Sequence, residues 1–63
     1  MTKENLGLWQ CYCDVNSTIR SIELLTKVIK NSGVEKKDLT DKLLDTHTNL
    51  YEILGILGKE LSL

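Results

Sequence analysis

Hydrophobic residues in the first half of the chain recur at alternating steps of four and three residues. Because an α-helix completes a turn in about 3.6 residues, side chains at these steps lie on one face. The pattern therefore predicts an amphipathic helix over about residues 5–31. Its expected inward face consists of Leu8, Tyr12, Val15, Ile19, Ile22, Thr26 and Ile29.

The second half of the chain has a similar spacing and predicts a second helix over about residues 36–60. The expected inward positions of this helix are Leu39, Leu43, Thr46, Leu50, Ile53, Leu57 and Leu61. Between the two patterns lies Asn31-Ser32-Gly33. Because glycine readily adopts the left-handed conformation that follows many helices, we predict a turn over about residues 32–35.

A short connection makes two successive helices pack antiparallel. Counting outward from the turn pairs Ile19 with Leu50 and Tyr12 with Leu57, and most other layers also pair two apolar side chains. The sequence therefore predicts an all-α fold: an antiparallel two-helix hairpin that forms a single domain over residues 1–63.

The chain carries more hydrophobic residues than one hairpin can cover. One interpretation is scattered exposed side chains, which are normal in small numbers. The interpretation that we favour is an interface, most simply in a homodimer that forms a four-helix bundle, although a different protein would also satisfy the pattern. The expected interface residues are Trp9, Leu24, Leu25, Val28, Leu44, Tyr51 and Leu54.

The length of 63 residues also favours association. A domain of this size buries only about 60% of the surface of its unfolded chain, and its core alone rarely contributes more than about 5 kcal/mol. Small proteins commonly add disulfides, a metal ion or further copies of themselves. The low stability expected of a lone core therefore favours association, as does the excess of hydrophobic residues.

Cys11 and Cys13 do not form a metal site or a disulfide with each other if they lie on a helix. Residues two apart point about 200° away from one another, and zinc sites require further ligands. Asp45 and His47 diverge for the same reason, and no catalytic motif accompanies them. We therefore expect no metal, no cofactor and no enzymatic activity. A disulfide between subunits through Cys13 remains an alternative.

The charge of the chain is nearly balanced, with eight Lys and Arg against nine Asp and Glu. It lacks the net basicity of a typical nucleic-acid-binding protein. No apolar run reaches about 18 residues, so we expect no membrane association. The polar first residues do not resemble a signal peptide, and we expect a cytoplasmic location in which cysteines stay reduced.

Basic residues gather toward the predicted turn, where nearby acids offset part of their charge. A solvated surface is one interpretation, and contact with an anion or with RNA is the other. The candidate anion or RNA contacts are Arg20, Lys27, Lys30, Lys36 and Lys37.

Several short groups of residues resemble the Rop family of plasmid RNA-binding proteins, which are dimers of helical hairpins. These groups are Met1-Thr2-Lys3, Ile19-Arg20-Ser21, and Asp45 with His47 and Leu50-Tyr51. The family contacts RNA through Asn, Phe, Gln and Lys side chains of its first helix. The positions that align with those contacts here hold Asp14, Thr18, Ile22 and Ile29. The resemblance therefore implies the dimeric architecture but does not supply the RNA contacts.

We interpret the sequence as that of a small non-enzymatic interaction protein. The expected role is regulation or inhibition of a host protein, as in proteins of phages and other mobile elements. A Rop-like dimer that binds RNA is the alternative, and a third possibility is a protein that binds or sequesters a small anionic ligand such as a nucleotide.

Overall fold

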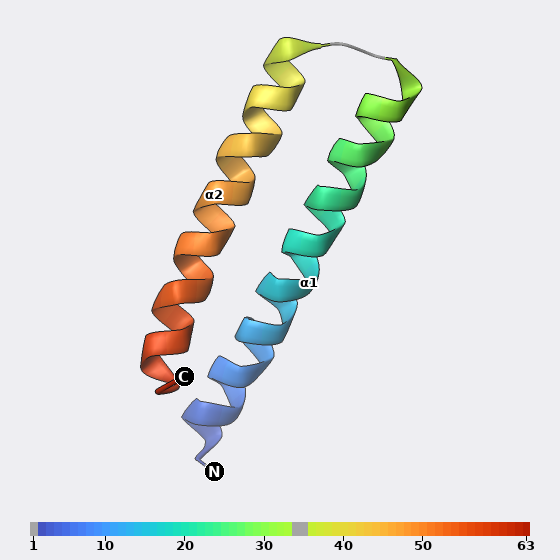
Figure 1. Ribbon diagram of the computed structural model, residues 1–63. Helices are drawn as coiled ribbons and strands as arrows, with labels where there is room; N and C mark the ends of the chain where they lie inside the picture. The colour runs from blue at the N-terminus through green and yellow to red at the C-terminus, as the bar shows by residue number, and fades with distance from the viewer. Residues whose placement is uncertain (1, 34–35) are drawn as a thin grey trace.

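The computed structural model describes residues 2–33 and 36–63 and forms a hairpin of two antiparallel helices (Figure 1). Helix α1 spans Lys3–Ser32 and helix α2 spans Lys37–Glu60. The two ends of the chain lie side by side, and the whole rod measures 47 × 15 × 15 Å. The predicted all-α hairpin is therefore confirmed. Part of the predicted turn, residues 34–35, lies outside the described residues.

Helix α1 begins earlier than the predicted residue 5 because Thr2 caps it. Thr2 has an extended backbone, and its Oγ1 accepts a hydrogen bond of 3.1 Å from the backbone N–H of Asn5. This bond satisfies one of the backbone donors that a helix N-terminus leaves unpaired. Helix α2 begins without such a cap, since Lys36 makes no side-chain bond there, but Asp38 in its first turn complements the helix dipole.

Both helices end with a residue in the left-handed conformation. Gly33 has φ 74° after α1, as its sequence position predicted. After α2 this position falls on Ser62, with φ 60°. The N–H of Ser62 donates to the carbonyl of Lys59 at 3.1 Å, and the N–H of Leu63 donates to the carbonyl of Gly58 at 2.8 Å. This pair of bonds is a Schellman motif, which satisfies carbonyls at the helix end.

The inward face of α1 agrees with the hydrophobic pattern. All seven predicted positions are buried or half-buried, and among the described residues Ile19 alone is fully buried, with 2% of its surface exposed. The polar member of the set, Thr26, is accommodated because its Oγ1 donates a 2.8 Å hydrogen bond to the carbonyl of Ile22. Its hydroxyl is therefore satisfied within its own helix.

The inward face of α2 differs from the prediction. Leu43, Leu50, Leu57 and Leu61 are half-buried as expected, but the predicted Leu39, Thr46 and Ile53 are exposed. The positions that turn toward α1 in their place are Thr40, His47 and Leu54. The helix is thus rotated by about 50° from the predicted orientation. As a result, the more hydrophobic edge of α2 is directed away from the contact between the helices.

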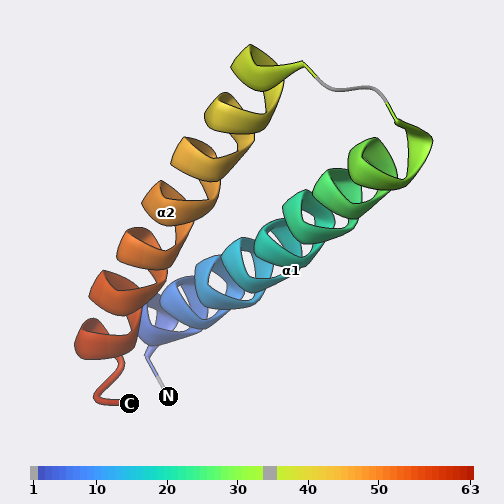
Figure 2. The same ribbon diagram turned by 45° about the horizontal axis from the view of Figure 1, so that its top comes forward.

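The two helices lie closest at the end that holds the termini and diverge toward the turn (Figures 1 and 2). Near the termini, Gly58 adjoins the ring of Tyr12, and a Cβ placed on this glycine would lie 4.0 Å from Tyr12 Cε2. Toward the turn the contact includes the polar residues Thr26, Thr40 and His47. The hairpin is therefore tightest at the terminal end and open at the turn end.

The single chain exposes more surface than a compact protein of its size. Its accessible area is 5162 Å², whereas a folded monomer of 7.2 kDa exposes about 4,100 Å². Its radius of gyration is 14.5 Å, against about 11 Å for a compact domain of this length. No described helix has an apolar stretch long enough to cross a membrane.

We expect Ser62→Gly to stabilise the protein by about 0.5–1 kcal/mol, because glycine removes the clash of a Cβ in the left-handed conformation. Gly33→Ala should have the opposite effect, with a loss of about 1 kcal/mol. Thermal unfolding followed by circular dichroism, at one fixed protein concentration, measures both changes. Ser62→Ala is the matched control, since it keeps the Cβ and should bring no gain. Equal stabilities of all three variants and the natural sequence would contradict these backbone assignments.

Candidate functional site

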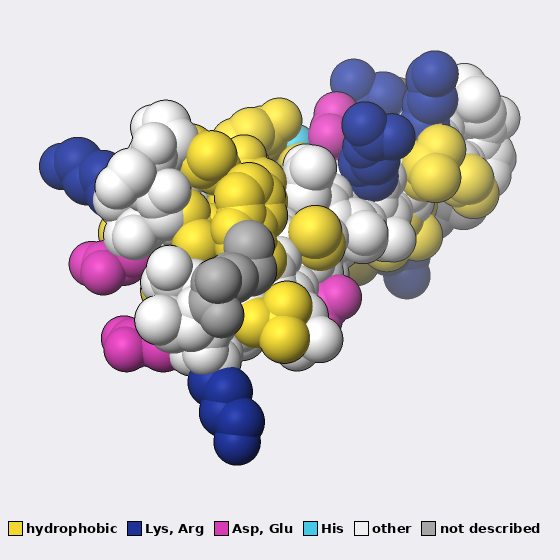
Figure 3. Space-filling view, turned by 90° about the horizontal axis from the view of Figure 1, so that it is seen from below, with side chains coloured by type: hydrophobic (Ala, Val, Ile, Leu, Met, Phe, Trp, Pro, Cys, Tyr) yellow, Lys and Arg dark blue, Asp and Glu magenta, His cyan; other side chains and the backbone are white. Residues whose placement is uncertain are grey.

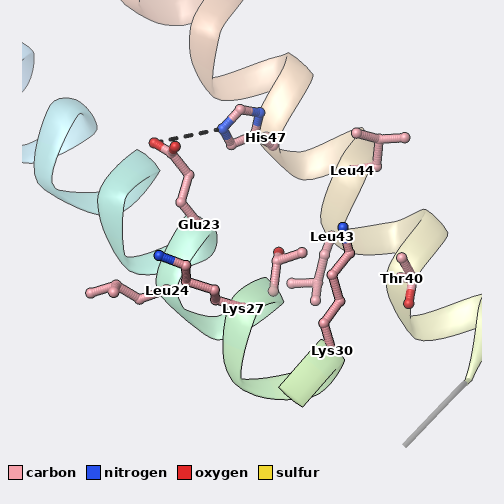
Figure 4. Close-up of a pocket in the computed structure, with 9 residues that line it drawn as sticks. Glu23, Leu24, Lys27, Lys30, Thr40, Leu43, Leu44 and His47 are labelled. Carbon is pink, nitrogen blue, oxygen red and sulfur yellow. Dashed lines mark ion pairs between the residues drawn. The ribbon is translucent and has the colours of Figure 1, made fainter. Parts of the chain in front are cut away.

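A pocket of about 560 Å³ lies between the two helices at their open end (Figure 4). Its volume falls within the usual range for binding pockets. The residues that line it come from both helices and are Glu23, Leu24, Thr26, Lys27, Lys30, Thr40, Leu43, Leu44 and His47. Because the helices diverge here, the pocket is a consequence of the way in which they pack.

Glu23 and His47 face each other across the pocket, one from each helix (Figure 4). His47 Nε2 lies 3.9 Å from Glu23 Oε1, which is too long for a hydrogen bond. The Nε2 atom is nevertheless buried and has no hydrogen-bond partner among the described residues. On its other side, the imidazole packs edge-on against Tyr51 with ring centroids 4.8 Å apart. The histidine thus lies between the helices, near Glu23 on one side and against Tyr51 on the other.

Lys27 and Lys30 make the turn end of the pocket basic. No acid in the described part of the chain forms an ion pair with either ammonium group. Lys30 extends from α1 toward α2 (Figure 4). The mouth of the pocket also has apolar edges, since Leu24 is 64% exposed and Leu44 is 63% exposed. The site therefore combines the positive charge of two lysines with exposed leucine side chains.

The described side chains that line this pocket include four titratable groups, Glu23, Lys27, Lys30 and His47, and no serine or cysteine. Cys11 and Cys13 are exposed, free thiols elsewhere on α1. In residues 2–33 and 36–63, no three potential metal ligands of the His, Cys, Asp or Glu type come together.

The seven predicted interface residues do not form one continuous patch. Leu24 and Leu44 line the pocket, and Tyr51 adjoins it through His47. Leu25 lies elsewhere around α1, and Val28 lies one turn along the helix from Leu24. Both are exposed, by 45% and 62% respectively.

The remaining two of these residues, Trp9 and Leu54, are half-buried within the hairpin. The Trp9 ring packs edge-on against Tyr12 at 5.8 Å between centroids. Hydrophobic side chains gather near the terminal end, and a group of Lys and Arg side chains lies nearer the other end (Figure 3). Part of the predicted interface therefore contributes to packing inside one chain.

The predicted basic contacts are likewise divided. Lys27 and Lys30 line the pocket, whereas Lys36 and Lys37 line a smaller hollow of about 380 Å³ with Asp38 and Leu39. Arg20 is exposed and lines neither. The structure therefore brings two of the five basic residues to the interhelical pocket.

A second exposed surface was not predicted from the sequence, and we call it the uncharged face. Its members recur every seven residues on each helix and are Cys11, Thr18 and Leu25 on α1 with Leu39, Thr46 and Ile53 on α2. All six are exposed and uncharged, and the charged Asp14 and Lys42 border them one helical turn from Thr18 and Thr46. Leu25 lies about 160° around α1 from Lys27, and Ile53 lies about 180° around α2 from Leu44, so this face is opposite the pocket. The seven-residue spacing was the signal by which it could have been found.

No protein-family model matches the chain, no curated protein matches its sequence, and no solved structure matches its fold. The resemblance to the Rop family is therefore carried only by the short groups of residues quoted above. The residues of the hairpin itself are the basis for any function assigned to it.

We expect His47→Leu to stabilise the protein by about 1 kcal/mol, because it removes a buried nitrogen without a partner and keeps an apolar contact with Tyr51. Urea denaturation at fixed protein concentration measures the change. Thr48→Leu, at an exposed position of the same helix, is the control and should leave stability nearly unchanged. A loss of stability in His47→Leu would mean that the histidine makes a favourable polar interaction in the folded protein.

Proposed function

We propose that the protein is a non-enzymatic interaction protein that works as a homodimer of hairpins, with the two copies forming a four-helix bundle. Each copy contributes its uncharged face to the contact between subunits. The dimer presents the opposite faces, which carry the pockets, to another protein. It regulates or inhibits that protein by covering part of its surface.

The exposed area of the lone chain is the observation that carries this proposal. The hairpin exposes 5162 Å², about 1,000 Å² more than a compact monomer of its mass. A stable protein–protein interface of standard size removes about 800 Å² from each partner. The surplus is therefore of the size that one subunit contact would cover.

The chemistry of the uncharged face supports its assignment to the contact between subunits. Interface cores are depleted of charged side chains, and four-helix bundles have core residues at seven-residue repeats. The uncharged face meets both conditions over three successive repeats on each helix. The pocket side, in contrast, carries Glu23, Lys27 and Lys30, which suit a surface that meets solvent or a charged partner.

The rotation of α2 supports the same assignment. The hydrophobic stripe of this helix includes Leu39 and Ile53, which remain 43% and 44% exposed beside the interhelical contact. A stripe that is wider than the contact with α1 has to meet a second surface to be covered. In a four-helix bundle each helix packs against two neighbours, so the core direction lies between them. The partly exposed edge of α2, which includes Leu39 and Ile53, lies on the side where such a second neighbour would pack.

A dimer formed in this way leaves hydrophobic side chains uncovered on the opposite side. Leu24 and Leu44 are each more than 60% exposed, and Tyr51 is 50% exposed. Exposed hydrophobic side chains gathered on one side are typical of protein interaction surfaces. This second surface supports a role in which the dimer binds a further protein.

We expect the double variant Leu25→Lys/Ile53→Lys to dissociate the dimer, since burying two unpaired charges in an apolar contact is strongly unfavourable. Analytical ultracentrifugation over a concentration series should show a dissociation constant raised by at least about 100-fold. Leu24→Lys/Leu44→Lys is the matched control, because it makes the same change of charge at two leucines that are 64% and 63% exposed on the other side of the hairpin. It should remain dimeric. A natural sequence that is monomeric and fully folded at micromolar concentration would overturn the proposed dimer.

Thiol protection provides a second test within the same chain. Cys11 belongs to the uncharged face, whereas Cys13 points about 200° away from it. In the single-cysteine variant Cys13→Ser, labelling of Cys11 by iodoacetamide should slow as the concentration rises through the dimer range. In Cys11→Ser, the rate for Cys13 should stay constant. Equal protection of the two thiols, or protection of Cys13 alone, would place the contact on another face.

A further inference from the structure

We infer that the pocket between the diverging helices is a docking site for an amphipathic helix of a partner protein, and that acidic residues of this helix pair with Lys27 and Lys30. The inference deepens the proposed function, on which it rests, because it states the chemistry of the partner that the pocket side receives. The site is formed within one hairpin, so each subunit of a dimer carries a complete copy.

The shape of the site suits a helix. The pocket lies between two helices that separate toward the turn (Figure 2), and the side chains of Leu24 and Leu44 flank it on its two outer sides (Figure 4). Leu24 and Leu44 are 64% and 63% exposed, so the pocket is open along its mouth rather than enclosed. A small ligand would be poorly covered there, because ligand sites typically bury at least about 70% of the ligand surface. An amphipathic helix instead places its apolar side chains against Leu43 and the flanking leucines and keeps its polar side in solvent.

The distribution of charge determines the chemistry of the partner helix. Lys27 and Lys30 line the turn end of the pocket without an acidic partner among the described residues. Glu23 lies nearer the middle of the hairpin, opposite His47. Carboxylates on the partner helix therefore gain favourable pairs at the turn end and meet repulsion from Glu23 further along. The partner should carry its acidic residues toward the turn and an uncharged residue opposite Glu23 and His47.

The polar groups deeper in the pocket do not compete for those carboxylates. The hydroxyl of Thr26 donates to the carbonyl of Ile22 at 2.8 Å, and that of Thr40 donates to the carbonyl of Lys36 at 3.2 Å. Both threonines therefore present their methyl groups and a satisfied oxygen, and Leu43 adds apolar surface. The pocket offers apolar contact inside and positive charge near one end.

A selection experiment tests the inference through the chemistry of the peptides that bind. A display library would hold amphipathic helices of about 18 residues, or five turns, with a fixed leucine stripe and Glu, Lys, Gln or Ser at each polar position. Selection on the full-length natural protein should enrich Glu beside the leucine stripe near one end of the peptide. Fluorescence anisotropy then measures the affinity of a selected peptide and of its Glu→Lys counterpart, which should bind at least about tenfold more weakly.

Charge reversal provides the decisive variant. Lys27→Glu/Lys30→Glu should lower the affinity for the selected acidic peptide by at least about tenfold. It should bind the Lys counterpart of that peptide better than the natural protein does. The matched control is Lys36→Glu/Lys37→Glu, which makes the same change of net charge at the separate hollow and should leave the affinity within about twofold. Circular dichroism checks that both variants keep their helices. Leu25→Lys/Ile53→Lys, which tests the dimer, should still bind the acidic peptide.

Several results would overturn the inference. Selection that enriches no peptide, or that enriches Lys and Gln as strongly as Glu, would remove its basis in charge. An unchanged affinity in Lys27→Glu/Lys30→Glu would place the peptide elsewhere on the hairpin. Displacement of the peptide by a structured RNA hairpin or by octyl phosphate, each at lower concentration than a competing unlabelled peptide, would assign the pocket to that ligand instead. Because ultracentrifugation measures the dimer separately, a natural protein that is monomeric but still binds the peptide would contradict the subunit contact alone.

Discussion

The contact between two helices is a narrow line, and this geometry limits what a lone hairpin can bury. Each helix turns only a stripe of its surface toward its neighbour, so side chains beside the stripe stay half-covered. In this protein the limit leaves Ile19 as the one fully buried side chain of the described residues, although the helices run to 30 and 24 residues. The hydrophobic effect scales with the area removed from water. Most of the available hydrophobic stabilisation therefore depends on surfaces outside the intrachain contact.

The residues beside this contact form two sides of different composition. One side repeats uncharged residues such as Leu25 and Ile53 at every seventh position, and the other holds the pocket with Glu23, Lys27 and Lys30. A hairpin has two such sides because α1 and α2 lie side by side in a single layer, and neither face of this layer is covered by another element of the described chain. The division allows self-association and partner binding to use different surfaces, so that a change on one side need not disturb the other.

The contact near the turn, where the pocket lies, includes several polar residues. Thr26, Thr40 and His47 supply less apolar surface there than leucine side chains would. At the terminal end, Tyr12 and Trp9 pack together and Leu57 and Leu61 supply apolar surface, and the helices lie closer there. The hairpin is thus held at one end and open at the other. The Nε2 atom of His47, which has no hydrogen-bond partner among the described residues, lies beside that opening.

The sequence determined the number of helices, their antiparallel arrangement, the inward face of α1 and the turn glycine. These features follow from local spacing and from the length of the connection, and neither depends on a partner surface. Only the tertiary structure decided which edge of α2 meets α1. The sequence offered Leu39, Thr46 and Ile53 as the better apolar set, and the packed hairpin uses Thr40, His47 and Leu54 instead. The physical reason is that an apolar pattern includes the residues that face any neighbour of a helix. The rotation of the helix depends instead on how its side chains fit one particular neighbour. For the same reason the pocket could not be predicted from the sequence, because it depends on the angle at which the two helices diverge.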